Sequence, residues 1–231
     1  MKTPKKTART AGFLYLIVVL TGIFSLLYVP KQLFDWDNAT ATYQNIVNNE
    51  TLFRLSIVAG IVCYTAFLLL PLVLYKLLNH INKTYAIAMV ALAVVSVPIS
   101  LVNLLHKMNV LTLLENENYA SSISEAQLHT QVLLYLNYYD NGIVLASVFW
   151  GLWLFPFGYL VYKSGFLPKV LGILLMVGCF GYLINFLGGF LIKDYAALGI
   201  GRFVSLPASL GEIGTCLWLL IVGTTLKKET N

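Results

Sequence analysis

The amino-acid sequence predicts an all-α integral membrane protein: a bundle of six transmembrane helices that forms a single membrane domain over residues 1–231. Its composition is the first indication, because 58% of the 231 residues are hydrophobic and only 11% are charged, whereas about 25% of residues are charged in a soluble domain. The second is a mean hydropathy of +0.78. The third is the stretch Gly142–Tyr162, whose 21 residues carry no charge and are enough, as a helix, to cross a hydrocarbon core of about 30 Å.

The first span is expected at about residues 11–29, after a basic tail, and ends at Pro30. Its apolar core is longer than that of a signal peptide, and its exit lacks a small-residue cleavage site. We therefore expect this segment to remain in the protein as an anchor. Residues 31–52 are expected to form a polar loop that can include an amphipathic turn lying on the membrane.

The second and third spans are expected at about residues 53–78 and 85–105, joined by a tight turn at residues 79–83. Both segments are long enough to cross the bilayer as helices. A second polar loop is expected at residues 106–127, which contain three glutamates.

The fourth span is expected at about residues 131–161. Upstream of it, Ser122-x-x-Glu125 fits a capping box, the pattern in which a serine and a glutamate three residues later open a helix. We therefore expect the fourth helix to begin outside the bilayer. A short basic turn leads into the fifth span, at about residues 169–191, and the sixth follows at about residues 203–225.

The distribution of charge predicts the orientation. If the N-terminus is cytoplasmic, ten of the fifteen Lys and Arg residues fall on the cytoplasmic side and seven of the ten Asp and Glu residues on the outer side. The positive-inside rule then places both termini in the cytoplasm. The net charge of +5 does not indicate nucleic-acid binding, because the basic residues lie in short loops and at the two ends rather than on one face of a soluble domain.

Motifs for metals, cofactors and nucleophiles are absent from the sequence. It contains no HExxH, GxSxG, P-loop or dinucleotide-binding glycine motif. His129 and Asp140 are eleven residues apart, about 16 Å along a helix, which is too far to share a metal ion. The cysteines, Cys63, Cys179 and Cys216, lie inside apolar segments at unrelated spacings and are expected to be packing residues. We therefore expect neither a metal nor a cofactor.

Several stretches resemble a known family. The stretch Phe149–Leu175, FWGLWLFPFGYLVYKSGFLPKVLGILL, is similar to the signature of a family of bacterial polytopic membrane proteins catalogued as domain of unknown function 4386. The opening Ala8–Pro30, the stretch Leu52–Leu78 and the SLGEI of Ser209–Ile213 resemble the same family. The resemblance implies a six-helix protein of the bacterial plasma membrane. It implies no reaction, substrate or catalytic residue.

Polar side chains within the spans indicate where a functional site is expected. Ionisable residues in a span are costly and normally face the interior of the bundle, where they meet a partner. On the third helix, Ser96, Ser100, Asn103 and Lys107 recur on one face, and Glu212 lies on a similar polar face of the sixth. Helix-rise estimates place the polar groups in the outer part of the bundle. The candidate ligand-binding residues are Arg54, Asn103, Lys107, Asp140, Asn141, Asn185 and Glu212.

Three classes of function remain open. The first is a non-enzymatic protein that binds a small amphipathic ligand or a lipid from the outer leaflet, as a carrier, sensor or accessory subunit. The second is an integral-membrane enzyme that acts on a lipid-like substrate through acid–base chemistry of Asp140, His106 and Glu212. The third is a purely structural role, in which the polar groups only hold the helices together. The specific expectation is that Arg54 or Lys107 lies within hydrogen-bonding reach of Asp140 or Glu212.

Overall fold

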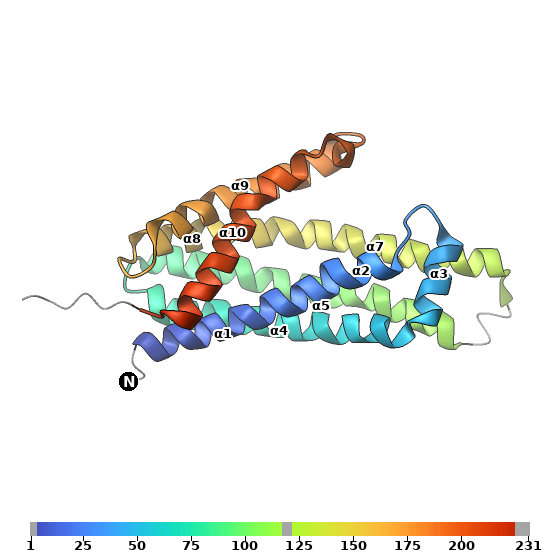
Figure 1. Cartoon of the computed structure of the whole chain (residues 1–231), viewed down its shortest axis with the longest axis horizontal. Coiled ribbons are helices and arrows are strands. Elements are labelled where there is room, and N and C mark those ends of the chain that lie inside the picture. Colours follow the sequence, from blue (N-terminus) through green and yellow to red (C-terminus); the bar gives the residue numbers. More distant parts are fainter. Residues whose placement is uncertain (1–3, 117–121, 225–231) are drawn as a thin grey trace, which may run out of the picture. The chain divides into compact units, whose positions relative to one another are not determined.

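The computed structural model describes residues 4–116 and 122–224, and every regular element in these ranges is helical (Figure 1). Six helical segments are long and apolar enough to cross a membrane, which confirms the predicted all-α six-helix protein. They are Pro4–Leu33, Glu50–Leu78, Lys83–Glu115, Glu125–Lys163, Lys169–Leu191 and Ile200–Ile221.

The chain forms two compact units. Unit 1 consists of residues 1–17, 66–97 and 145–231, and unit 2 of residues 18–65 and 98–144. Four helices contribute residues to both units: α1 (Pro4–Gly22), α4 (Glu50–Leu78), α5 (Lys83–Glu115) and α7 (Glu125–Leu152). Neither unit is therefore a separate stretch of the sequence.

Unit 1 contains α8 (Leu154–Lys163), α9 (Lys169–Leu191), the 3₁₀ turn η2 (Tyr195–Leu198) and α10 (Ile200–Ile221). Helix α9 packs against both α8 and α10 (Figure 1). The helices approach closely because small residues line the contacts. A Cβ atom on Gly178 would lie 2.6 Å from the Ala208 Cα of α10, so that contact accepts only glycine.

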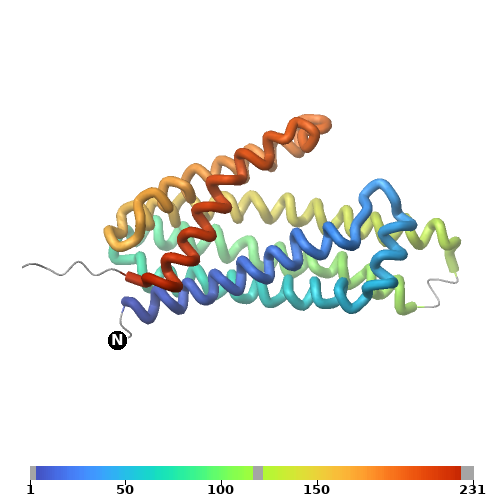
Figure 2. Tube along the Cα trace, in the orientation of Figure 1, coloured from blue at the N-terminus to red at the C-terminus, as the bar shows by residue number. Residues whose placement is uncertain are grey.

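Unit 2 contains the π-helical segment η1 (Ile23–Tyr28), α2 (Val29–Leu33) and α3 (Ala39–Asn48). Figure 2 traces α2, the turn that follows it and the short α3. The unit is built around an apolar core drawn from α2 to α7: Val29, Leu33, Ile46, Phe53, Ile57, Val110, Leu113, Leu128, Val132 and Leu136. The expected polar loop at residues 31–52 is therefore partly helical, and α3 buries Thr42 and Ile46.

The predicted loop at residues 106–127 is wrong for its first half, because α5 continues to Glu115. The extra turns carry Lys107, Val110 and Leu113, which are buried at helical spacing. Apolar contacts of Val110 and Leu113 on this stripe continue the helix through a segment that also contains His106, Asn109, Thr112 and Glu115.

The start of α7 differs from the predicted capping box by two residues. The helix begins at Glu125, and its cap is Ser124: the Gln127 backbone N–H donates to Ser124 Oγ at 3.3 Å, while the Ser124 N–H donates to Gln127 Oε1 at 2.9 Å. The sequence contains the capping pattern twice. Ile123, which precedes the cap, packs against the core that includes Leu128, and this hydrophobic staple selects the second register.

Candidate functional site

The seven candidate residues are divided between the two units. Unit 2 contains Arg54, Asn103, Lys107, Asp140 and Asn141, and unit 1 contains Asn185 and Glu212.

Arg54 meets glutamates rather than the expected Asp140. Its guanidinium pairs with Glu50, 2.6 Å away and one turn earlier on α4, and with Glu115 at the end of α5. Asp140 is exposed and makes no hydrogen bond or ion pair within the described chain, so the expected pairing of Arg54 with Asp140 is wrong. Because the side chains of Arg54 and its partners are 44–57% exposed, solvent screens these ion pairs and they contribute little to stability.

Lys107 is the most buried charged residue of unit 2, with 0% of its surface exposed. Its Nζ atom donates to Ser56 Oγ at 3.2 Å and to the Ser25 carbonyl at 3.4 Å. The same atom lies 4.4 Å from the centre of the Tyr139 ring and 6.0 Å from that of Phe34. Across the described part of the chain, no carboxylate lies within ion-pairing distance of Lys107. The amine is therefore surrounded by neutral groups.

The Ser25 carbonyl is available to Lys107 because of a register change in the first helix. At the end of the π-helical segment, the Val29 N–H donates to the Phe24 carbonyl instead of to Ser25. The next residue, Pro30, has no N–H to donate. The Ser25 carbonyl therefore lacks a helical donor, and the Lys107 side chain supplies one. Single turns of π-helix are frequent at functional sites.

Asn103 lies one turn before Lys107 and joins α5 to α7. Its Nδ2 donates to the Tyr139 carbonyl at 2.8 Å, and its side chain occupies the space beside Gly142, where a Cβ atom would collide with it. Ser96, Ser100, Asn103 and Lys107 are all at most 6% exposed. The predicted polar face of the third helix is thus confirmed as a buried face.

Asp140 and Asn141 are exposed and do not join this cluster, whereas their neighbour Tyr139 is buried. The sequence placed the polar residues of α7 at the correct position along the helix axis but on the wrong helix face. Successive residues of a helix differ by about 100° of rotation, so a neighbour of the buried residue faces another way. Reasoning from sequence also missed Ser25, Ser56 and Tyr139. For Ser25, the available signal was Pro30, since a proline inside a helix frees a carbonyl about one turn earlier.

In unit 1, Glu212 of α10 meets tyrosines. The Tyr15 hydroxyl donates to Glu212 Oε1 at 3.2 Å, and the Tyr182 hydroxyl of α9 interacts with the same carboxylate. The Tyr15 ring is buried beside Trp153 and Phe157, with ring centres 6.3 and 6.5 Å away. No Lys, Arg or His in the described ranges forms an ion pair with Glu212.

Asn185 is part of a local hydrogen-bond network and does not meet Glu212. Its Nδ2 donates to Ser205 Oγ at 2.8 Å and to the Gly201 carbonyl at 3.2 Å, and its Oδ1 accepts from the Tyr195 hydroxyl at 2.9 Å. Because the amide is satisfied by α10 and η2, Asn185 is best explained as a group that holds α9 against these two elements.

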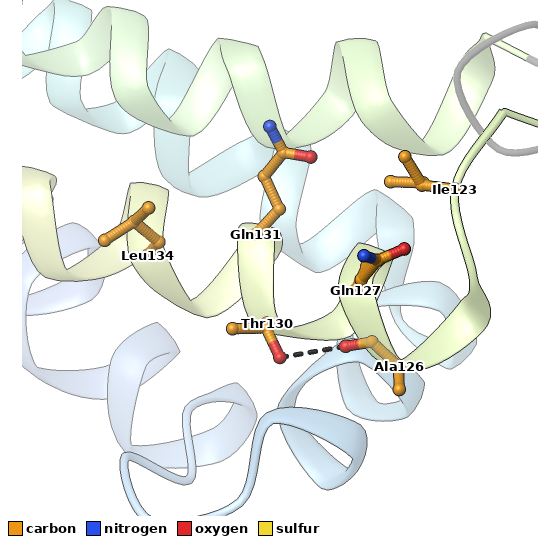
Figure 3. A pocket seen from close by; sticks show the side chains of 6 residues that line it. All are labelled: Ile123, Ala126, Gln127, Thr130, Gln131 and Leu134. Atoms are coloured by element: carbon orange, nitrogen blue, oxygen red, sulfur yellow. Dashed lines mark hydrogen bonds between the residues drawn. The ribbon is translucent and has the colours of Figure 1, made fainter.

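Two pockets lie at the start of α7, and none of the seven candidate residues lines either of them. The first, of about 490 Å³, is lined almost entirely by consecutive turns of α7 (Figure 3). The second, of about 360 Å³, adds residues from the end of α5, among them Asn109 and Thr112. The Thr130 hydroxyl in the first pocket bonds to the Ala126 carbonyl of its own helix. These pockets do not contain the buried ionisable groups.

His106, the histidine of the catalytic alternative, lies beside the rings of Tyr135 and Tyr138, with ring centres 6.4 and 5.6 Å away. No group of three or more His, Cys, Asp or Glu residues that could hold a metal ion occurs in residues 4–116 and 122–224. The cysteines are free and buried, and Cys216 Sγ lies 3.6 Å from the Gly12 carbonyl.

Comparisons with known proteins place the chain in a family without assigning an activity. No solved structure matches it. An uncharacterized protein of Archaeoglobus fulgidus is 39% identical over 84 residues, which cover 36% of this chain and 48% of the relative. The chain therefore aligns with about half the length of that relative. The family described as domain of unknown function (DUF4386) matches residues 10–223, and the chain therefore belongs to this family.

Proposed function

We propose that this protein is a non-enzymatic, membrane-embedded binding protein for a small anionic amphipathic molecule, with the Lys107 amine as the group that binds the anion. The carrier, sensor and accessory-subunit roles are all compatible with such a site. The observation that carries the proposal is the complete burial of Lys107 among Ser25, Ser56 and Tyr139, with no carboxylate of the described residues in reach.

The cost of burying the amine makes an opposite charge beside it favourable. Moving an ammonium group from water into a protein interior costs several kcal/mol even after relaxation. A cation–π contact returns about 0.5–2 kcal/mol and a hydrogen bond to a charged group about 1.5–3 kcal/mol. A ligand carboxylate or phosphate supplies the opposite charge, and its apolar tail suits a chain with six membrane-spanning segments. An ionisable residue inside a membrane segment is by default a candidate for function.

A structural role is the second candidate, because Lys107 of α5 bonds to both η1 and α4. In that case the amine would hold three segments together and no anion would be required. The two roles differ in whether Lys107 controls ligand affinity or only stability.

We further propose that the protein lies in the plasma membrane with both termini in the cytoplasm. The support for this orientation is the excess of Lys and Arg in the segments assigned to the cytoplasmic side.

The test measures binding of dodecanoate and of dodecyl phosphate to the full chain in phosphatidylcholine nanodiscs. Lys107→Met removes the charge and keeps an unbranched side chain, whereas Lys31→Met removes an exposed lysine of α2 as the matched control. We expect at least a tenfold loss of affinity in Lys107→Met and unchanged affinity in Lys31→Met. Dodecyltrimethylammonium should not compete. Failure of both anions to bind the unmodified protein, or equal binding to both variants, contradicts the proposal.

A further inference from the structure

Glu212 of unit 1 is an acidic side chain within a membrane-spanning helix. No cationic side chain of the described residues forms an ion pair with it. Its contacts within the described chain are the Tyr15 hydroxyl from α1 and the Tyr182 hydroxyl from α9. The other titratable group nearby is the Cys216 thiol on α10 itself. Without a cation, a carboxylate at such a position has one other route to neutrality, which is to take up a proton.

We propose that Glu212 is a proton-binding site, whose carboxyl group takes up and releases a proton while Tyr15 and Tyr182 satisfy its oxygens in both states. A phenol hydroxyl can donate or accept a hydrogen bond. The ionised carboxylate accepts hydrogen bonds from both tyrosines. The neutral acid donates its proton toward one phenol oxygen and accepts from the other. The Glu212 carboxyl can therefore take up and release a proton without leaving a buried polar atom without a hydrogen bond.

The surroundings keep bulk water away from the tyrosine side of this carboxyl. Trp153 and Phe157 stack on one another with ring centres 5.0 Å apart, and both have 0% exposed surface. Phe67 meets the Trp153 ring edge-on at 5.1 Å. Glu212 itself remains partly exposed on α10, which leaves one side of the carboxyl accessible.

A second, independent observation is an unpartnered hydroxyl on the same helix as Glu212. The Thr215 hydroxyl lies three residues further along α10, on the same face as Glu212. It is fully buried and has no hydrogen-bond partner within the described residues. A buried hydroxyl without a partner is usually satisfied by ordered water, and a water bound there would lie about one helical turn from Glu212.

The first experiment treats the full chain in nanodiscs with dicyclohexylcarbodiimide between pH 5 and 9 and maps the adducts by mass spectrometry. The reagent reacts with a neutral carboxyl: the acid proton adds to one carbodiimide nitrogen and the carboxyl oxygen to the central carbon, and nothing leaves. We expect an adduct on Glu212 that decreases as pH rises. Glu212→Gln should abolish it, and the matched variant Asp140→Asn, which removes an exposed acid from another span, should leave it unchanged.

A second measurement does not depend on access of the reagent. Infrared difference spectra should contain the carbonyl band of a neutral carboxylic acid at pH 7, and Glu212→Gln should remove it. In Tyr15→Phe, which removes a donor to the ionised form, the band should persist to higher pH. If Glu212 were purely structural, Tyr15→Phe would leave the pH dependence of the carbonyl band unchanged. If the parent protein shows no neutral-acid carbonyl band that Glu212→Gln removes at any pH from 5 to 9, Glu212 stays ionised, and this result overturns the proposal.

Discussion

Lys107 and Glu212 are both ionisable side chains in helices long enough to cross the membrane, and neither forms an ion pair within the described chain. Lys107 is held by a carbonyl, a hydroxyl and an aromatic face. Glu212 accepts a hydrogen bond from the Tyr15 hydroxyl and lies near Tyr182. A charge held by neutral groups makes a small net contribution to stability at best, because hydrogen bonds only partly offset the cost of desolvation. Both residues are therefore better explained by function than by stabilisation.

The Lys107→Met variant should keep nearly the stability of the parent protein. Replacing a buried charge with an apolar side chain of similar length is often neutral or stabilising, although the Ser25 carbonyl loses its donor at a cost of about 1–3 kcal/mol. We expect the free energy of unfolding to stay within about 2 kcal/mol of the parent value. Thermal unfolding in detergent checks this. A loss of about 3–5 kcal/mol, typical of breaking a buried ion pair, would instead support the structural role of Lys107.

Gly142 allows a test of the contact between α5 and α7. A methyl group at this position would collide with the Asn103 side chain, which must then give up its 2.8 Å bond to the Tyr139 carbonyl. We expect Gly142→Ala to destabilise the protein by about 1–3 kcal/mol. Gly189→Ala is the control, since nothing lies within 4 Å of the Cβ it would add.

The double variant Asn103→Ala with Gly142→Ala gives a further check of the same contact. Removal of the Asn103 amide removes the collision, so the double variant should be more stable than the sum of the two single changes predicts. Strictly additive losses in thermal unfolding would show that the two residues do not interact.

At the scale of elements, unit 2 depends on two short helical segments that hydrophobic length alone does not reveal. The π-helical segment η1 sets the position of the Ser25 carbonyl. Helix α3 is capped by Asn38, whose side chain accepts from the Ala41 N–H at 3.0 Å. It is attached to α7 through His129, whose Nδ1 lies 3.1 Å from the Thr40 hydroxyl and whose ring lies 4.1 Å from the Tyr43 ring. Few contacts attach α3 to the rest of unit 2, so α3 should be the part of unit 2 that unfolds locally most easily.

His129→Ala should therefore release α3 without unfolding the long helices. We expect faster amide hydrogen exchange over Ala39–Asn48 and little change in the apolar middle of α4. The loss of a hydrogen bond and a ring contact corresponds to about 1–3 kcal/mol of local stability. Thr130→Ala is a matched control on the next residue, because the Thr130 hydroxyl bonds only to the backbone of α7. Equal exchange in the two variants would contradict the proposed attachment.

At the scale of the whole molecule, the described residues contain six candidate membrane spans, and an even number of spans predicts that both termini lie on the same side of the membrane. Reporter fusions test which side that is. We expect fusions after Asn49 and after Asn118 to report the outer side, and one at Asn231 to report the cytoplasm, because Lys and Arg gather on the opposite side from the acidic loops. Asn118 and Asn231 lie outside the described residues. A cytoplasmic signal from either loop fusion would reverse the predicted orientation.

The sequence by itself determined the number of long apolar helical segments in the described residues and the buried polar face that carries Asn103 and Lys107. These features follow from properties that are one-dimensional: the length of an apolar run and its spacing of about 3.6 residues per turn. The resemblance carried by Phe149–Leu175 was likewise sufficient to name the family.

Only the tertiary structure decided which groups meet. Arg54 pairs with Glu115, 61 residues away, and Tyr15 meets Glu212, 197 residues away. Tyr139 rather than Asp140 faces Lys107, because a single residue rotates a side chain by about 100° around the helix axis. The Ser25 carbonyl depends on a change of hydrogen-bond register within one helix. Partner choice of this kind depends on helix rotation and on contacts distant in sequence, and no local pattern of residues specifies either.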